Sequence, residues 1–382
     1  MIFLGQASNY KGRVLRHLFA RGNAKDSAEL KVALAKRYKV EKSSAYESAE
    51  RVELYHTGRS ALAAAIIAVA PKGSQVIIPG LTCIAVVRAV KAAGCEPVFV
   101  DIDPQTLQYD WQALDKTLKA YYNASVIVAQ NTLGLPLDMT KLEGVAKKNH
   151  LEIIEDLAHC AGRFYADGRE IGSVGAATAL SFGKGKAIDT ISGGALVLRS
   201  ARFTMPSPPQ FRAKRCARWR ERWYPALGTT IRAGYHVGLG KIFTAIFLKF
   251  GWIERSADAE LDLDVKLTDW QAKLALTQLE KLPKTAKQSL GPIRAHYLVK
   301  QRSKLLTECA EHGFYLNEIW YDTPVSPVRY AKEANFPSKD CPHTVAVAKT
   351  IINLPSWYSE EQLALVRELI RPYELHRGED DD

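Results

Sequence analysis

The sequence has few cysteines and no long hydrophobic run, and these two absences exclude several classes of protein. Its six cysteines, among 382 residues, include no pair spaced as CxxC and form no dense framework. A zinc site and disulfide stapling are therefore not indicated, and we expect reduced thiols in a cytoplasmic protein without a bound metal. No apolar stretch reaches the ~20 residues that a membrane-spanning helix needs. The opening residues, MIFLGQASNYKGR, contain an apolar run too short for a signal peptide.

The composition describes a large folded protein with an uneven charge. Apolar residues make up 47% of the chain, and its length suits one large domain and a smaller one. The net charge of +11 suggests an anionic partner, but it is concentrated: eight basic residues and one acidic residue lie between Arg199 and Arg222. A DNA-binding module is disfavoured, because this run contains no recognisable reading helix and no zinc-ligand spacing.

An acid, a hydroxyl and an amine follow two strand patterns in the middle of the chain. The apolar run 151–154 ends in Glu155 and Asp156, as a buried parallel strand does. A second apolar run, 176–182, carries Ser181 and leads to Lys186 in a glycine-punctuated loop. Because open α/β sheets bind ligands at the carboxyl ends of their strands, we expect Asp156, Ser181 and Lys186 at one rim.

These three groups suit pyridoxal 5'-phosphate (PLP). The cofactor needs an amine for its aldehyde, a carboxylate that keeps the pyridine nitrogen protonated, and donors for its phosphate. We expect Lys186 to form the Schiff base, Asp156 to pair with the ring nitrogen and Ser181 to contact the phosphate. A charge-assisted hydrogen bond of this kind contributes about 1.5 to 3 kcal/mol.

Further strand and helix patterns alternate around this stretch. Apolar runs at 74–79, 97–103 and 126–129 predict strands, and residues 84–93 and 139–148 predict helices. This is the βαβ order of a mostly parallel sheet that is covered by helices. Amphipathic spacing predicts a helix at 25–40, and a long helix is expected from Arg294 to His312.

The segments EDLAHCAG, SFGKGK and the later pair Gly193 and Gly194 resemble the signature segments of the DegT/DnrJ/EryC1/StrS aminotransferases. The resemblance covers residues 55–197 and returns, more loosely, from residue 263. It implies an α/β fold of the PLP-dependent fold type I, with a PLP-binding large domain at 1–200 whose core is 50–200. A basic and apolar helical insertion at 201–256, a connecting helix and small α+β domain at 257–375, and a disordered acidic tail at 376–382 would follow.

The same resemblance suggests further cofactor contacts. HTGRSAL resembles the family's phosphate-binding motif, which implies phosphate contacts for the backbone amides around Gly58, Arg59 and Ser60. Ala158 would lie beneath the cofactor ring. His159 stands where the family has a glutamine beside the cofactor's phenolic oxygen, and an imidazole can make the same hydrogen bond.

Three positions depart from the family's pattern. Cys83 replaces an aromatic residue that stacks on the cofactor, although sulfur can also lie against a ring face. Ser192 stands before the glycine pair where the family has an acid. Asp264 occupies the place of an asparagine that reaches the phosphate of the neighbouring subunit, so that role is not transferred.

The segment 202–256 has no counterpart in the signature segments. A Pro-rich turn is followed by the basic, aromatic run FRAKRCARWRERWYP and then by a largely apolar stretch. Three interpretations stay open: packing on a partner subunit or over the active site, arginine contacts with the phosphates of a nucleotide-linked substrate, and peripheral membrane contact through residues 212–253.

The sequence thus predicts a homodimeric PLP-dependent aminotransferase. By resemblance, it would transfer an amino group from an amino acid, expected to be L-glutamate, to a nucleotide-linked keto sugar for cell-surface polysaccharide or secondary-metabolite biosynthesis, with Lys186 as the general acid and base. A PLP-dependent sugar dehydratase is the rival enzyme, but relatives that dehydrate have lost this lysine. A non-catalytic sensor that binds PLP or a sugar nucleotide is the other alternative, favoured by Cys83, Ser192 and Asp264.

Overall fold

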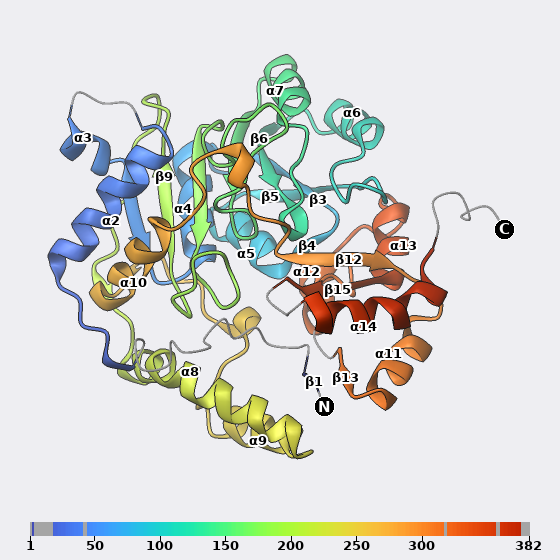
Figure 1. Ribbon diagram of the computed structural model, residues 1–382. Helices are drawn as coiled ribbons and strands as arrows, with labels where there is room; N and C mark the ends of the chain where they lie inside the picture. The colour runs from blue at the N-terminus through green and yellow to red at the C-terminus, as the bar shows by residue number, and fades with distance from the viewer. Residues whose placement is uncertain (1, 4–17, 41–43, 317–318, 357–359, 376–382) are drawn as a thin grey trace.

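A mixed β-sheet lies at the centre of the computed structural model, which describes residues 2–3, 18–40, 44–316, 319–356 and 360–375 (Figure 1). Within these residues the sheet has nine strands in the order β10-β11-β2-β9-β8-β7-β6-β3-β5. Their bounds are β2 Val52–Tyr55, β3 Gln75–Pro79, β5 Glu96–Val100, β6 Ala124–Gln130, β7 Glu152–Asp156, β8 Ala177–Ser181, β9 Gly194–Leu198, β10 Phe211–Arg212 and β11 Val265–Lys266.

The strands that carry the expected site residues belong to the parallel part of the sheet. β5, β3, β6, β7 and β8 pair in parallel, whereas β9 and β2 run antiparallel to their neighbours. Parallel neighbours need crossover connections, and the chain supplies α5 (Ile84–Ala92), α6 (Trp111–Ala120) and α7 (Met139–Lys148) for them. The predicted strands at 74–79, 97–103, 126–129 and 151–154 are confirmed as β3, β5, β6 and β7, and the helix predicted at 139–148 is α7.

Side chains alternate between two hydrophobic layers along these strands. Val76 and Ile78 of β3 face the layer that contains α4 (Gly58–Val69) and α5, whereas Ile77 between them packs in the other layer. That second layer is covered by α2 (Ala24–Arg37), α6, α7 and α10 (Asp269–Leu279). Because both faces are buried, the strands read as continuous apolar runs, which is why they were visible in the sequence.

A smaller unit follows α10 in the chain. Its strands β12 (Arg294–Leu298) and β15 (Ile351–Pro355) pair antiparallel and pack against α11 (Arg302–Glu311) and α14 (Glu360–Ile370). The helix predicted from Arg294 to His312 is therefore wrong for residues 294–301, which precede α11. The pairing of β12 with β15 joins residues far apart in sequence, and the helix begins only after Gln301, which has a left-handed backbone with φ of 52°.

The remaining elements are short or connect these units. They are α3 Ala45–Ala49, α12 Ala331–Ala334, α13 Pro342–Thr350, the strand pairs β1 Ile2–Phe3 with β13 Phe314–Tyr315 and β4 Thr82–Cys83 with β14 Val325–Ser326, and the 3-10 helices η1 Thr132–Gly134, η2 Ser256–Asp258, η3 Ala286–Gln288, η4 Val328–Tyr330 and η5 Arg371–Tyr373. The acidic tail at 376–382, expected to be disordered, lies outside the described residues.

Two helices form a hairpin that projects from the main body (Figure 1). α8 (Arg215–His236) and α9 (Gly240–Lys249) share a small apolar cluster, which includes Tyr224, Ile231 and Phe247 and also Ile191 of the loop after β8. Gly240 permits their close approach, because a β-carbon there would collide with the ring of Tyr235. Among the helices of the described chain, none is both long and apolar enough to cross a membrane.

Candidate active site

Asp156 is the last residue of β7 and lies at the carboxyl edge of the parallel strands. Its side chain is 9% exposed, and Oδ1 accepts a hydrogen bond from the Ala158 N–H at 2.9 Å. Burial raises the pKa of Asp156, while the Ala158 N–H and the ammonium group of Lys186 act in the opposite direction. A cationic ligand at this carboxylate would keep it ionised, which is the requirement for pairing with a protonated pyridine nitrogen.

Lys186 lies in the turn that follows β8. Its backbone N–H donates to the Gly183 carbonyl at 3.2 Å, and its Nζ atom lies 4.5 Å from the centre of the Trp320 ring. The Lys186 charge lowers the pKa of Asp156 and of His159, so the three side chains lie within electrostatic range of one another. The structure thus brings the expected amine and the expected carboxylate to the same edge of the sheet.

His159 lies beside them in the turn after β7. Its ring stacks on Trp320 with centroids 5.1 Å apart and an angle of 24°, and Nδ1 is 3.5 Å from the Tyr321 hydroxyl. Burial, together with the charges of Lys186 and Arg294, lowers the pKa of His159 well below its ordinary value. The imidazole is therefore neutral near pH 7, and one of its nitrogens can donate a hydrogen bond to an anionic oxygen.

Trp320 and Arg294 are site residues that the sequence analysis did not identify. Two cations lie over the Trp320 ring, Lys186 Nζ at 4.5 Å and Arg294 Cζ at 4.6 Å from its centre, and both are within the range of cation–π attraction. Arg294 is fully buried and donates to the Asn353 carbonyl at 3.3 Å. No local sequence pattern marks either residue. The pattern at Arg294 predicts a helix, and Trp320 reaches the site only through the fold.

The expected phosphate site is formed by the N-terminus of α4 and the end of β8. The Thr57 side chain caps α4 by accepting from the Ser60 N–H at 3.2 Å. Gly58 packs so closely on Ser181 that an added β-carbon would lie 2.5 Å from the Ser181 β-carbon. The helix N-terminus offers free N–H groups and a positive dipole end, and Ser181 adds a hydroxyl, which is a donor set that suits a phosphate.

The side chains of Arg59 and Ser60 bind other parts of the chain. The Arg59 guanidinium donates to backbone carbonyls of residues 256–259, among them Ala257 at 3.4 Å, and burial lowers its pKa. The buried Ser60 hydroxyl donates to the Asp262 carbonyl at 2.8 Å. Both side chains therefore hold the segment before β11. The Ser60 N–H is used by Thr57, so only the amides of Gly58 and Arg59 remain for a phosphate.

Cys83 and Ala158 lie at the same edge. Cys83 precedes α5, where its sulfur accepts from the Ala85 N–H at 3.5 Å, and it pairs with Ser326 of the small unit. The Cys83 thiol also affects the pKa values of Arg59 and Tyr321, which places it near the site. Ala158 is partly exposed beside Asp156.

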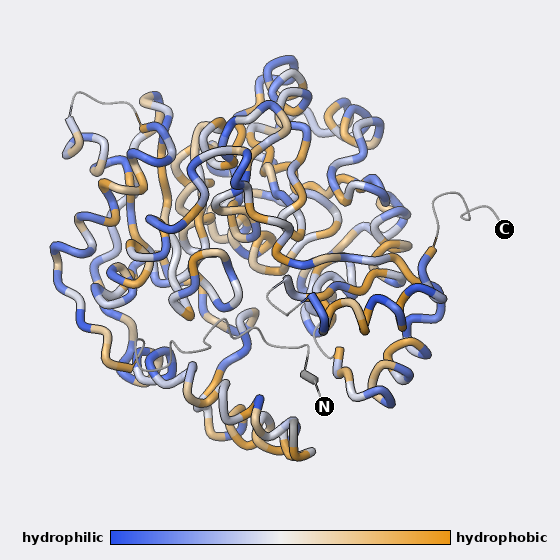
Figure 2. The backbone as a smooth tube through the Cα atoms, in the orientation of Figure 1, coloured by the Kyte–Doolittle hydropathy of each residue, from blue (hydrophilic) through white to orange (hydrophobic). Residues whose placement is uncertain are grey.

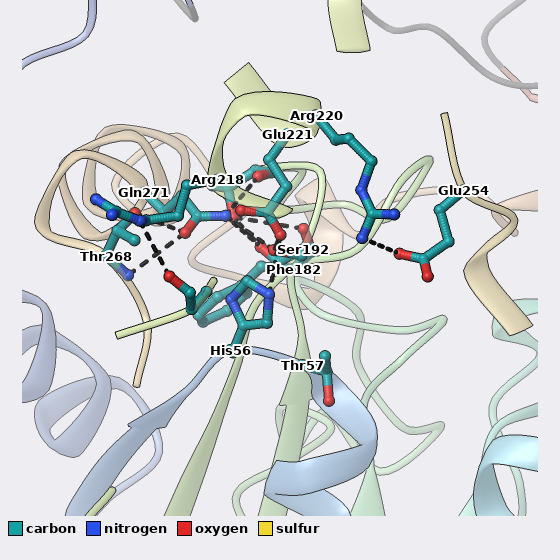
Figure 3. Close-up of polar contacts among 12 residues, drawn as sticks. His56, Thr57, Phe182, Ser192, Arg218, Arg220, Glu221, Glu254, Thr268 and Gln271 are labelled. Atoms are coloured by element: carbon teal, nitrogen blue, oxygen red, sulfur yellow. Dashed lines mark hydrogen bonds and ion pairs between the residues drawn. The ribbon is translucent and has the colours of Figure 1, made fainter. Parts of the chain in front are cut away.

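The other two departures differ in their surroundings. Ser192 donates to a carboxylate, that of Glu221 on α8, at 2.5 Å (Figure 3). Asp264 is exposed, and its carbonyl accepts from the Phe211 N–H at 2.8 Å. The sequence could not show Glu221 as a neighbour of Ser192, because the two residues belong to different elements.

A family model matches most of the chain. The model of the DegT/DnrJ/EryC1/StrS aminotransferase family matches residues 41–370. GDP-perosamine synthase from Escherichia coli O157:H7 is 26% identical over 330 residues, which cover 83% of this chain and 84% of that protein. L-glutamine:2-deoxy-scyllo-inosose aminotransferase from Micromonospora echinospora is 34% identical over 129 residues, which cover 34% of this chain and 30% of that protein.

Solved structures share the fold. Spr1654 from Streptococcus pneumoniae, in its PLP-form, superposes with a TM-score of 0.65 at 17% identity and covers 96% of this chain and 97% of that one. Its PMP-form superposes with a TM-score of 0.66. At this identity the similarity establishes the α/β architecture of fold type I.

Proposed function

Since the chain belongs to the DegT/DnrJ/EryC1/StrS aminotransferase family and is a PLP-dependent aminotransferase, we propose that it aminates a nucleotide-linked keto sugar. The observation that carries the catalytic part of this proposal is the position of Lys186 and His159 around Trp320, with the Lys186 charge acting on Asp156. The names of the relatives support the sugar, since one is a GDP-perosamine synthase and another acts on 2-deoxy-scyllo-inosose.

In this proposal each residue of the site has a separate role. PLP supplies an electron sink for chemistry at the carbon that carries the amine. Asp156 pairs with its ring nitrogen, His159 with its phenolic oxygen, and Ser181 with the amides of Gly58 and Arg59 holds its phosphate. Lys186 Nζ takes and returns the proton in each half reaction.

The amino donor in this proposal is L-glutamate. L-glutamine is the direct competitor, because the name of one relative specifies it. Purified protein loaded with PLP is mixed with each amino acid alone, and loss of the visible absorbance of the lysine-bound cofactor is followed. The donor that bleaches it is then paired with a panel of keto sugar nucleotides and with the free keto sugars. Bleaching by glutamate and amination of nucleotide-linked sugars are expected; amination of free sugars alone contradicts the nucleotide linkage.

The same experiment distinguishes an aminotransferase from a protein that only binds its ligand. A sensor that only binds PLP or a sugar nucleotide would keep its absorbance with every amino donor. Replacement of Lys186 by alanine is the control, because the variant has no amine to hold the cofactor aldehyde.

The proposed assembly is a cytoplasmic homodimer whose subunits each have a large domain at 1–200, an insertion at 201–256 and a small domain at 257–375. Arg220, Arg218 and Arg215 of the insertion lie near its base and suit contacts with a second subunit or with substrate phosphates. Sedimentation equilibrium of the PLP-loaded protein tests the dimer, since a monomer at micromolar concentration would contradict it.

A peripheral membrane contact through residues 212–253 is the second partner in the proposal. Ile242 and Ile246 of α9 and its C-cap residue Phe250 follow one another at helical spacing, and they are 53%, 39% and 63% exposed. Figure 2 shows hydrophobic residues along the hairpin of α8 and α9. The sequence has no acidic residue between Glu221 and Glu254, whereas Lys241 and Lys249 flank the apolar side chains. Co-sedimentation with phosphatidylglycerol vesicles but not with phosphatidylcholine vesicles is expected, and equal or absent binding at low salt contradicts it.

A further inference from the structure

A carboxylate from the inserted hairpin lies against two loops of the site. Glu221 of α8 is only 8% exposed. Its Oε1 atom accepts from the Ser192 hydroxyl at 2.5 Å and lies 3.1 Å from His56 Nε2 (Figure 3). Acidic side chains are rarely buried to this extent without partners. The two contacts therefore define a specific polar arrangement between the insertion and the large domain.

Both contacts of Glu221 lie directly beside the expected phosphate site. His56 precedes Thr57 and Gly58, and Ser192 precedes the pair Gly193 and Gly194. The two loops touch, because Thr57 and Gly193 form a β-bridge, and a β-carbon at Gly194 would lie 2.6 Å from the Gly58 α-carbon. A side chain that holds His56 and Ser192 together thus acts on the backbone of Gly58.

Gln271 fixes the orientation of the Ser192 hydroxyl. Its Nε2 atom donates to Ser192 Oγ at 2.9 Å and to the Thr190 carbonyl at 3.1 Å, and its own oxygen accepts from the Thr268 hydroxyl at 2.6 Å. Because Oγ accepts from Gln271, its single proton is directed to Glu221. The Ser192 proton is thus used within the network and is not available to a substrate.

Two atoms of the network have hydrogen-bonding capacity that the network does not use. Glu221 Oε2 and His56 Nδ1 are buried, and neither has a partner among the residues that the structure describes. A buried polar atom without a partner costs about 1 to 3 kcal/mol. The arrangement is therefore not optimised for folding alone, which favours a role in the site.

We propose that Glu221 is a positioning residue for the phosphate-binding turn. Its carboxylate orients His56 and Ser192 and so holds the amides of Gly58 and Arg59 where they meet the phosphate of PLP. The inference rests on the proposed phosphate site at Gly58, Arg59 and Ser181. It gives the insertion a function at the cofactor, in addition to any partner that binds its outer surface.

The test compares two ligands that differ only in the phosphate. Dissociation constants of PLP and of pyridoxal are measured by absorbance titration of the apo protein. For E221A, we expect PLP to bind about tenfold more weakly, which corresponds to about 1.4 kcal/mol, and pyridoxal to bind as in the unchanged protein. E221Q keeps an oxygen for Ser192 and is expected to lose less. Equal losses for both ligands, or no loss, would overturn the inference.

Two further variants keep the result interpretable. E254Q is the matched control, because it breaks the 3.1 Å ion pair between Arg220 of α8 and Glu254 without touching His56 or Ser192; its ligand preference should not change. S192A removes the other half of the contact and should reproduce the E221A effect if E221A does not fold. Loss of the PLP preference in E254Q but not in S192A would contradict the role of Glu221.

Measurements on the unchanged protein distinguish a failure of the phosphate assignment from a failure of the role of Glu221. If it binds PLP and pyridoxal equally well, the phosphate assignment fails and the inference fails with it. If it prefers PLP and both E221A and S192A keep the full preference, the phosphate site stands and only the role of Glu221 is wrong.

Discussion

The carboxyl edge of the parallel strands and the hairpin of α8 and α9 differ in how their residues reach the site. Asp156 ends β7 and Lys186 lies in the turn after its neighbour β8, so the pairing of these two strands brings the two residues to one edge. Glu221 belongs to a helix outside the sheet and reaches Ser192 only through the packing of the insertion. The edge thus holds groups for the chemistry, whereas the hairpin supports the loops around them.

The sharpest test of this comparison is the exchange of Lys186 for alanine. Since Lys186 is the proposed proton donor and acceptor, and such groups contribute about 10²- to 10⁴-fold to a rate, K186A should lower kcat by at least that factor. Lys184 offers a control in the same turn, because its Nζ atom donates to the Glu254 carbonyl and lies over Tyr224. Single-turnover assays of both variants measure this effect. Similar losses of rate in K184A and K186A would contradict the assignment of Lys186 as the proton donor and acceptor.

The next largest effect is expected at Asp156. D156N keeps the shape of the side chain but removes the charge that pairs with the ring nitrogen. The loss of a charge-assisted hydrogen bond of about 1.5 to 3 kcal/mol corresponds to about a 10- to 150-fold lower kcat. Steady-state kinetics measure this effect, and the melting temperature serves as the folding control. A variant with full turnover would show that Asp156 only terminates β7.

How much of the site the sequence predicts depends on the distance between its residues along the chain. Asp156 and Ser181 end buried strands and Lys186 lies in the turn after one of them, so the strand pattern places them at one edge. Arg294 and Trp320 reach Lys186 through the small unit, whose β12 pairs with β15 more than fifty residues later. Local propensity favoured a helix at Arg294, and this long-range pairing overrode it.

A smaller, pH-dependent effect is expected from His159. Its pKa is lowered on folding, whereas the unfolded chain binds a proton near pH ~6.5. The unfolded state then holds more protons, so the free energy of unfolding should fall as the pH drops below about 6.5, by at most about 1.4 kcal/mol per pH unit. Urea unfolding of the protein and of H159N between pH 5 and 8 measures this slope.

His296 provides the comparison for that measurement. Burial lowers the pKa of His296 as well, but for His159 the charges of Lys186 and Arg294 act in the same direction as burial. H159N should therefore flatten the pH dependence of stability more than H296N does. Equal slopes in H159N and in the unchanged protein would contradict a neutral, buried imidazole at this position.

The smallest effect is expected on the outer surface of the hairpin. Ile242 and Ile246 of α9 and its C-cap residue Phe250 are exposed, and none of them takes part in the Glu221 contacts. Substitutions at such positions usually change stability by less than about 0.5 kcal/mol each. The triple variant I242S/I246S/F250S should therefore keep its melting temperature. Its PLP affinity and its turnover should stay within about twofold of the unchanged protein. A large loss of PLP affinity would mean that the whole hairpin, and not Glu221 alone, holds the phosphate-binding turn, because only then would a change on the far side of α9 reach Gly58.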